Sequence, residues 1–239
     1  MSPLDLDRLR AALPERAIEY YPSLASTQTV AAGRPPGTIV LANEQTAGRG
    51  RHSHSWHSEP DTGIYFSIVL QPNPVLTLAL GLATAEAITA ATGIACDLRW
   101  PNDILVDGKK TAGILVELAD GAAIGGIGVN VNHAAFPPDL AAEATSLRLH
   151  AHREFSRTEI LLALIPAIDA YQRLDKDSIL RLFTQASSYA VGRRVAVTQP
   201  EGIVEGVTSG LDPSGYLVVR KDDGTDTLIL AGGVRAAGS

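Results

Sequence analysis

Residues 103–131 read DILVDGKKTAGILVELADGAAIGGIGVNV, and this stretch decides the fold. It contains three apolar runs close together, each of which we expect to form a strand. The Asp107-Gly108 pair between the first two runs is a strong signal for a tight hairpin turn. Consecutive strands joined by hairpins predict an α+β fold with a mixed or antiparallel sheet, not regular βαβ winding. The expected strands are Ile104–Val106, Lys110–Leu118 and Ala122–Val131.

The flanking sequence supplies further strands and the helices that pack on the sheet. An alanine-rich run with apolar residues at helical spacing predicts a packing helix over Leu78–Thr92. A capping box at Ser156–Glu159 starts a helix that we expect to run toward Ser187, with a break or kink near Pro166. The other expected elements are a helix over Pro3–Leu13 capped by Ser2, and strands over Ile18–Tyr21, Thr38–Ala42 and Gly63–Leu70.

The pattern changes after Val191, where short apolar runs alternate with turn signals such as Asp212–Gly215 and Asp222–Gly224. About 50 residues of this kind predict a small closed β-barrel. We therefore expect two domains, a larger one over residues 1–188 and a barrel over residues 189–239.

Composition narrows the class of protein. The chain has 239 residues, a formal net charge of −6 and one cysteine, Cys96. The negative charge argues against an extended nucleic-acid surface, and nothing at the N-terminus resembles a helix-turn-helix module. A single cysteine suits a reducing compartment, and neither a signal peptide nor a membrane-spanning run is present. We expect a cytoplasmic protein that binds neither DNA nor a membrane.

The loop from Glu44 to Trp56 carries the chemistry. It places Gly48, Arg49, Gly50 and Arg51 between two strand-like runs. Glycine allows the backbone to approach a ligand closely, and arginine offers a planar fork that matches phosphate or carboxylate. The loop therefore predicts an anion-binding site.

Several familiar sites can be set aside. The chain has no P-loop and no Gly-x-Ser-x-Gly elbow, and the run from Gly48 to Ser53 lacks the third glycine of a dinucleotide fingerprint. His52, His54 and His57 have a spacing that could suggest a metal, but no helix or acidic partner sets the geometry. We interpret them as part of a solvated loop and predict no metal site.

Two further segments could converge with this loop on one anionic ligand. The first is Arg99-Trp100-Pro101-Asn102-Asp103, and the second is Lys110 with Gly113. Taken singly, Lys110 reads as an ordinary hairpin lysine and Asp103 as a turn former. Taken together, an aspartate and a lysine one hairpin apart beside a glycine-marked strand indicate a shared site.

At these residues the chain resembles the biotin protein ligases. The order and spacing of the motifs match, and the sequence after Val191 is similar to the small SH3-like C-terminal barrel of that family. The resemblance is to the monofunctional form, which lacks the N-terminal DNA-binding domain. The motifs that carry it are Gly48–Arg51 with Trp56, Trp100–Asp103, Lys110–Glu117 and Gly126–Asn132.

The resemblance implies a fold and a two-step reaction. The fold is a mixed sheet with helices packed on one side, similar to the class II aminoacyl-tRNA synthetases, followed by the SH3-like barrel. Biotin and ATP would form biotinyl-5′-AMP with Mg²⁺ on the triphosphate. The biotinyl group would then pass to a lysine of the biotin carboxyl carrier domain of a carboxylase. The protein would be a monomer or a homodimer.

The resemblance also assigns roles to residues. Lys110 would bridge the biotin carboxylate and the α-phosphate, Arg51 would close over the adenylate, and Asp103 would orient or deprotonate the incoming lysine. The biotin-binding set is Ser26, Thr27, Gln28, Gln45, Arg49, Gly50, Arg51, Lys110, Gly113 and Gly126. The ATP-binding set is Arg51, Trp56, Asn102, Lys110 and Asn130.

Some positions depart from the family pattern, and two alternatives stay open. His52-Ser53-His54 replaces a glycine and an arginine of the loop, Gln28 stands where asparagine is usual, and Arg99 replaces a lysine. The chain could instead be a lipoate or octanoate ligase of the same superfamily. It could also be a protein that binds biotin without turnover.

Overall fold

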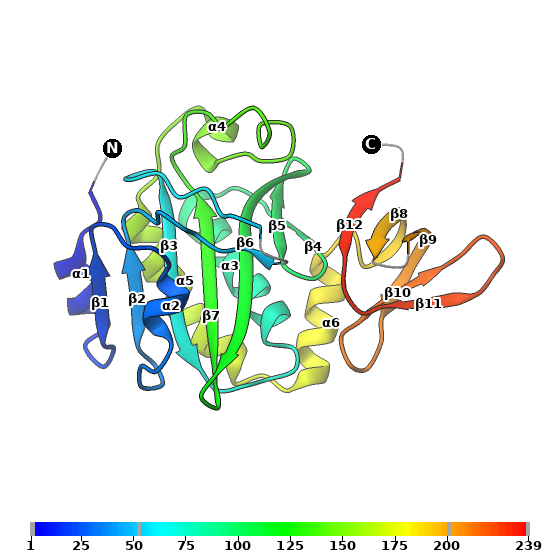
Figure 1. Ribbon diagram of the computed structural model, residues 1–239, viewed down its shortest axis with the longest axis horizontal. Helices are drawn as coiled ribbons and strands as arrows, with labels where there is room; N and C mark the ends of the chain where they lie inside the picture. The colour runs from blue at the N-terminus through cyan, green and yellow to red at the C-terminus, as the bar shows by residue number, and fades with distance from the viewer. Residues whose placement is uncertain (1–2, 52–53, 200–201, 238–239) are drawn as a thin grey trace.

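A seven-stranded sheet forms the larger part of the molecule (Figure 1). The computed structural model describes residues 3–51, 54–199 and 202–237. Only β1 and β2 pair in parallel, and all other neighbours are antiparallel. The expected mixed sheet is therefore confirmed. In spatial order the strands are β1 (Ile18–Tyr21), β2 (Ile39–Ala42), β3 (Gly63–Leu70), β7 (Ala122–Asn130), β6 (Lys109–Ala119), β5 (Asp103–Val106) and β4 (Asp97–Arg99).

The hairpins of residues 103–131 form the centre of this sheet. Asp107 and Gly108 join β5 to β6 with φ values of 48° and 74°, the left-handed conformations that a tight two-residue turn requires. The register pairs Gly113 of β6 with Gly128 of β7 and with Asp103 of β5. Two glycines thus lie side by side on one face of the sheet, next to the end of β5.

Helices cover the two faces of the sheet unequally. The larger helices, α3 (Leu76–Thr92) and α5 (Arg157–Gln172), lie behind the sheet in Figure 1, whereas the short α2 (Thr27–Ala31) lies in front. Alternation along the strands explains this, because successive side chains point to opposite faces. The main core lies on the α3 side, and a smaller cluster of Val40, Val69 and Ile124 packs under α2.

The helix does not break at Pro166, contrary to one of the two expected outcomes. Pro166 lies inside α5, and the chain breaks after it, where Asp175 caps α6 (Lys176–Ala186) by accepting a hydrogen bond from the Ser178 amide. Proline removes one backbone donor, but buried side chains on both sides of it, such as Leu161 and Ile168, hold α5 against the core. The burial of these side chains outweighs the free energy of the backbone hydrogen bond that is lost at Pro166.

The N-terminal helix is shorter than expected. α1 (Leu6–Ala12) begins after Asp5, whose carboxylate accepts a hydrogen bond from the Arg8 amide at 2.9 Å. Asp5 therefore takes the capping role that we assigned to Ser2, which lies outside the described residues. A further short helix, α4 (Leu147–Ala151), was not predicted; Ser146 caps it.

The C-terminal strands form a separate antiparallel sheet in the order β11-β10-β9-β8-β12. It lies beside α6 and β4 in Figure 1. The indole nitrogen of Trp100 donates a hydrogen bond to the Gly215 carbonyl at 2.9 Å and ties the two sheets together. Among the described residues, no helix has the length and apolarity to cross a membrane. The strands are β8 (Val191–Gln199), β9 (Gly202–Leu211), β10 (Leu217–Arg220), β11 (Asp226–Ile229) and β12 (Gly233–Ala236).

Candidate active site

The predicted site residues meet at one cavity on the face of the sheet that carries α2. Every residue of the predicted biotin-binding set lines it, and Trp56 and Asn102 of the predicted ATP-binding set do as well. Among the described residues the lining excludes Asp103 and Asn130. The shared lining is Ser26, Thr27, Gln28, Gln45, Arg49, Gly50, Arg51, Trp56, Asn102, Lys110, Gly113 and Gly126.

Hydroxyl and amide groups form one end of the cavity. Gln45 Oε1 accepts hydrogen bonds from the Thr27 amide at 2.9 Å and its hydroxyl at 3.1 Å. Ser67 Oγ lies 2.8 Å from Thr27 Oγ1 and 2.9 Å from Gln28 Oε1. Ser26 Oγ is buried with no hydrogen-bond partner among the described residues. An unpaired buried hydroxyl beside a fixed network is a feature of a site prepared for a polar ligand.

Glu117 links this end of the cavity to the loop from Glu44 to Trp56, called the arginine loop below. One carboxylate oxygen accepts from Gln28 Nε2 at 3.1 Å, and the other pairs with Arg49 Nη2 at 2.7 Å. The Gln28 side chain crosses directly over Gly126, where an added Cβ would lie 2.9 Å from Gln28 Oε1. Glycine is required here because any side chain would displace Gln28.

Two cations converge on Asp103 at the other end. Lys110 Nζ lies 2.6 Å from Asp103 Oδ1, and Arg99 Nη2 lies 2.8 Å from Oδ2. Burial is the largest influence on the pKa of Asp103 and would raise it. The charges and hydrogen bonds of Lys110 and Arg99 together outweigh burial, and the pKa of Asp103 lies below its usual value. The aspartate is an anion that holds two cations in place.

Arg51 is held by the loop that precedes β5. Its Nη1 donates to Asn102 Oδ1 at 3.0 Å, and Asn102 Nδ2 donates in turn to the Ile114 carbonyl at 3.1 Å. Burial lowers the pKa of Arg51, opposed by the charge of Asp103. Arginine stays protonated under any ordinary condition, so the partly desolvated guanidinium is ready to pair with an anion.

The paired glycines of β6 and β7 provide a flat bed for Trp56. An added Cβ would lie 3.0 Å from the indole at Gly113 and 2.4 Å from it at Gly128. Lys110 Nζ lies 5.3 Å from the centre of the ring. The indole therefore covers the region between the amide end and the cationic end of the cavity.

The arginine loop folds back on itself in this structure. The Trp56 amide donates to the Gly48 carbonyl at 2.8 Å, and the Gly50 amide donates to the His54 carbonyl at 2.7 Å. An added Cβ on Gly48 would lie 2.5 Å from the Trp56 carbonyl oxygen, which explains the need for glycine. His52 and Ser53, where the sequence departs from the family pattern, lie outside the described residues.

Asn130 supports the segment that holds Lys110. It is buried at the end of β7, and its Nδ2 donates to the Thr145 carbonyl at 3.1 Å. The Thr145 amide donates to the Lys110 carbonyl at 2.9 Å, so this segment also supports Lys110. Asn130 lies on the same face of β7 as Gly126 and Gly128 but is not part of the cavity lining.

Ser67, Glu117 and Arg99 also contribute to the site, although they were not among the predicted site residues. Ser67 is fully buried in the otherwise apolar strand β3, and a polar residue there was a signal that could have found it. Glu117 and Arg99 were noticed within motifs but given no site role. Their ion pairs arise from neighbouring strands and the loop, which spacing along the chain does not show.

Comparisons with known proteins agree with this architecture. Residues 21–132 match the Biotin/lipoate A/B protein ligase family, and residues 190–234 match the Biotin protein ligase C terminal domain. The bifunctional ligase/repressor BirA of Bacillus subtilis is 34% identical over 226 residues, covering 86% of this chain and 70% of that protein. The chain belongs to the biotin protein ligase family.

Another relative and a solved structure support the assignment. The biotin–[acetyl-CoA-carboxylase] ligase of Mycobacterium tuberculosis is 32% identical over 210 residues, covering 82% of this chain and 77% of that protein. The biotin protein ligase of Aquifex aeolicus, solved with biotin and ATP, matches with a TM-score of 0.83 at 30% identity. The match covers 92% of this chain and 99% of that one. The expected biotin ligase fold with an SH3-like C-terminal part is confirmed.

Proposed function

We propose that this chain is an ATP-dependent biotin protein ligase that forms biotinyl-5′-AMP and transfers biotin to a lysine of a carrier domain. The observation that carries the proposal is the convergence of Arg51, Lys110 and the Thr27–Gln45 network on one cavity. The match of residues 190–234 to a biotin protein ligase domain favours biotin over lipoate.

The amide end of the cavity suits the biotin head group. A fused urea ring presents both N–H donors and a carbonyl acceptor, and the network of Ser26, Thr27, Gln28 and Gln45 offers both kinds of partner. Gly126 leaves room for the Gln28 side chain to reach this end of the cavity. We assign this end to the head group, with the biotin carboxylate directed toward Lys110.

The cationic end suits the chemistry of adenylation. The carboxylate of biotin must approach the α-phosphate of ATP, and two anions come together only where fixed positive charge offsets their repulsion. Lys110 lies between the two and stabilises the charge that develops as pyrophosphate leaves. Arg49 and Arg51 cover the adenylate and keep water from the anhydride.

The nucleotide is assigned to the indole side of the cavity. Trp56 offers a face for the adenine ring, and Asn102 supplies an amide in the lining. Asn130 lies outside the lining, and its Nδ2 is bound to the Thr145 carbonyl, so we assign it to support of the nucleotide side of the site. The described lining carries cations but no carboxylate, so Mg²⁺ fits as a partner of the triphosphate and not as an ion caged by protein. When bound, Mg²⁺ neutralises charge on the leaving pyrophosphate.

Asp103 takes a different role from the one first expected. Held between Lys110 and Arg99 with a lowered pKa, it is a weak proton acceptor for an incoming lysine. We assign it as a positioning residue that keeps the Lys110 ammonium aimed at the reacting groups.

The partner and the setting follow from the reaction. We propose that the acceptor is the biotin carboxyl carrier domain of a carboxylase, that the protein acts in the cytoplasm without binding DNA, and that it is a monomer or a homodimer. We further propose a catalytic domain over residues 1–188 and a barrel domain over residues 189–239. The second sheet, which begins at Val191, supports this boundary.

Biotin-dependent exchange of labelled pyrophosphate into ATP tests the first half-reaction. Exchange with biotin but not with lipoate, followed by biotin incorporation into an added carrier domain, is the expected result. Exchange with lipoate alone would assign the lipoate alternative. Tight biotin binding without exchange would make the protein a biotin carrier without turnover.

A further inference from the structure

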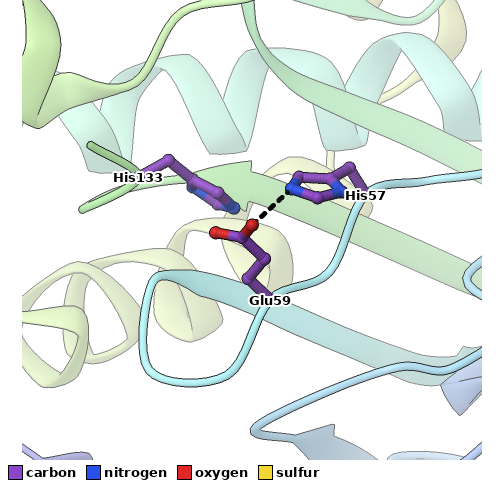
Figure 2. A group of neighbouring side chains, drawn as sticks. All are labelled: His57, Glu59 and His133. Carbon is purple, nitrogen blue, oxygen red and sulfur yellow. Dashed lines mark ion pairs between the residues drawn. The ribbon is translucent and has the colours of Figure 1, made fainter. Parts of the chain in front are cut away.

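Three side chains that commonly bind metals gather outside the lining of the cavity (Figure 2). His57 and Glu59 precede β3, and His133 follows β7. One potential ligand atom from each lies within 4.8 Å of the other two, and His57 Nε2 is 3.1 Å from Glu59 Oε1. Strands β3 and β7 pair with Gly63 opposite Asn130, so the sheet brings these segments together.

The buried His133 ring contacts two hydroxyl groups through Nε2. The hydroxyls of Thr62 and Tyr65 both donate to the Glu59 carbonyl, at 3.0 and 2.9 Å. His133 Nε2 lies 2.9 and 3.2 Å from the same hydroxyl oxygens. With both hydroxyl protons directed at the carbonyl, the hydroxyl oxygens accept a hydrogen bond from Nε2–H. In that arrangement the neutral ring has its lone pair on Nδ1.

One nitrogen of the His133 ring remains without a hydrogen bond. His133 is fully buried, and its Nδ1 has no hydrogen-bond partner among the described residues, whereas His57 Nε2 pairs with Glu59. Leaving such an atom buried and unpaired is costly, and a metal-binding histidine characteristically has its other ring nitrogen held by a hydrogen bond. Phe136 stacks on His133 with ring centres 5.1 Å apart, which shields this side.

We propose that His57, Glu59 and His133 bind a divalent transition-metal ion, with Zn²⁺ the best match. Two imidazoles and one carboxylate form a donor set that suits Zn²⁺, with water completing the coordination. Mg²⁺ prefers an all-oxygen shell, so this site is distinct from any Mg²⁺ on the nucleotide. Glu59 is half exposed and free to draw in toward the ion.

A bound ion would restrict the position of Trp56, because Trp56 and His57 are adjacent in the chain. His57 directly follows Trp56, whose indole lies over Gly113 and Gly128. Tying His57 to the segment after β7 fixes the backbone that carries the indole. Metal binding is therefore expected to stabilise the folded protein, independently of which substrate the cavity takes.

This site was not expected from the sequence. His57 was grouped with His52 and His54 as part of a solvated loop. His54 is exposed, whereas the partner that completes the cluster, His133, is far away along the chain. No spacing rule links the two segments, and only the pairing of β3 with β7 brings them together.

Metal binding to the chelator-stripped full-length protein tests the proposal. Zn²⁺ affinity is measured by competition with a chromophoric chelator, and the absorption of bound Co²⁺ reports the ligands. The variants are His57→Gln and Glu59→Gln, with His150→Gln and His54→Asn as matched controls. His150 pairs with Asp107 at 2.8 Å, the same chemistry without a third ligand.

We expect the wild type and both controls to bind one Zn²⁺ per chain and to gain thermal stability from it. Each cluster variant is expected to bind Zn²⁺ at least about tenfold more weakly. Unchanged affinity in both cluster variants, loss of binding in the controls, or displacement of Zn²⁺ by equimolar Mg²⁺ would overturn the proposal. Circular dichroism of the metal-free variants checks that they are folded. If His57→Gln is not folded, the Zn²⁺ affinity of Glu59→Gln alone tests the proposal.

Discussion

Lys110 Nζ lies 2.6 Å from Asp103 Oδ1, across the hairpin that joins β5 to β6. The pair is partly buried, with side-chain exposures of 29% and 16%, so the lysine keeps access to the cavity while the aspartate is mostly enclosed. A second cation, Arg99, holds the other oxygen of Asp103. The position of the ammonium is thus set by a carboxylate that is itself anchored.

Removing the ammonium should stop adenylation. Lys110→Ala is expected to lower the rate of biotin-dependent pyrophosphate exchange by about a thousandfold, because the charge that offsets the approach of two anions is lost. Circular dichroism should show a retained fold, because Arg99 still neutralises Asp103. Near-normal exchange in this variant would contradict the assignment of Lys110.

Asp103→Asn separates a positioning role from a proton-accepting one. An amide holds two cations poorly, so Lys110 loses its fixed position and exchange should fall by about a hundredfold. Transfer of biotin from preformed biotinyl-5′-AMP is then measured separately. If transfer alone fell while exchange stayed normal, Asp103 would be the base for the acceptor lysine and our assignment would be wrong.

Gly126→Ala should weaken biotin binding. The new Cβ would lie 2.9 Å from Gln28 Oε1 and push aside a side chain that Ser67 and Glu117 also hold. Loss of about one hydrogen bond to the head group corresponds to a roughly tenfold rise in Kd for biotin, measured by calorimetry. Gly233→Ala is the matched control, because an added Cβ there meets nothing within 4 Å. Equal affinities in the two variants would exclude Gln28 from the head-group site.

Cys96 should react slowly with thiol reagents in the folded protein. Burial raises the pKa of its thiol to about 12, so the thiolate is scarce at pH 8. Below the ordinary thiol pKa both folded and unfolded forms are protonated. As the pH rises toward 12, only the unfolded form ionises, and stability should fall. Labelling at pH 8 with and without urea measures the protection of the thiol. Cys96→Ala should reduce the alkaline loss of stability but not abolish it, because burial also raises the pKa of Tyr65 and Tyr171.

Local sequence was sufficient for the strands and for much of the cavity. Asp107-Gly108 predicted the β5–β6 hairpin because few residue pairs adopt left-handed conformations at both turn positions. Gly48, Gly113 and Gly126 were recognised within motifs, and each lies where a Cβ would contact a neighbouring group. These features depend on backbone conformation, which residues adjacent in the sequence determine.

Tertiary packing decided the rest. Pro166 stayed helical because its neighbours are buried, and Asp103 became an anchored anion because Arg99 lies on the adjacent strand. His133 joined His57 only through the pairing of β3 with β7. The sequence alone determined the strand order along the chain, the turns and the family to which this protein belongs. The tertiary structure determined which charged groups and which histidine nitrogens lie close together. Coulombic interactions and burial depend on distance in space and not on separation along the chain.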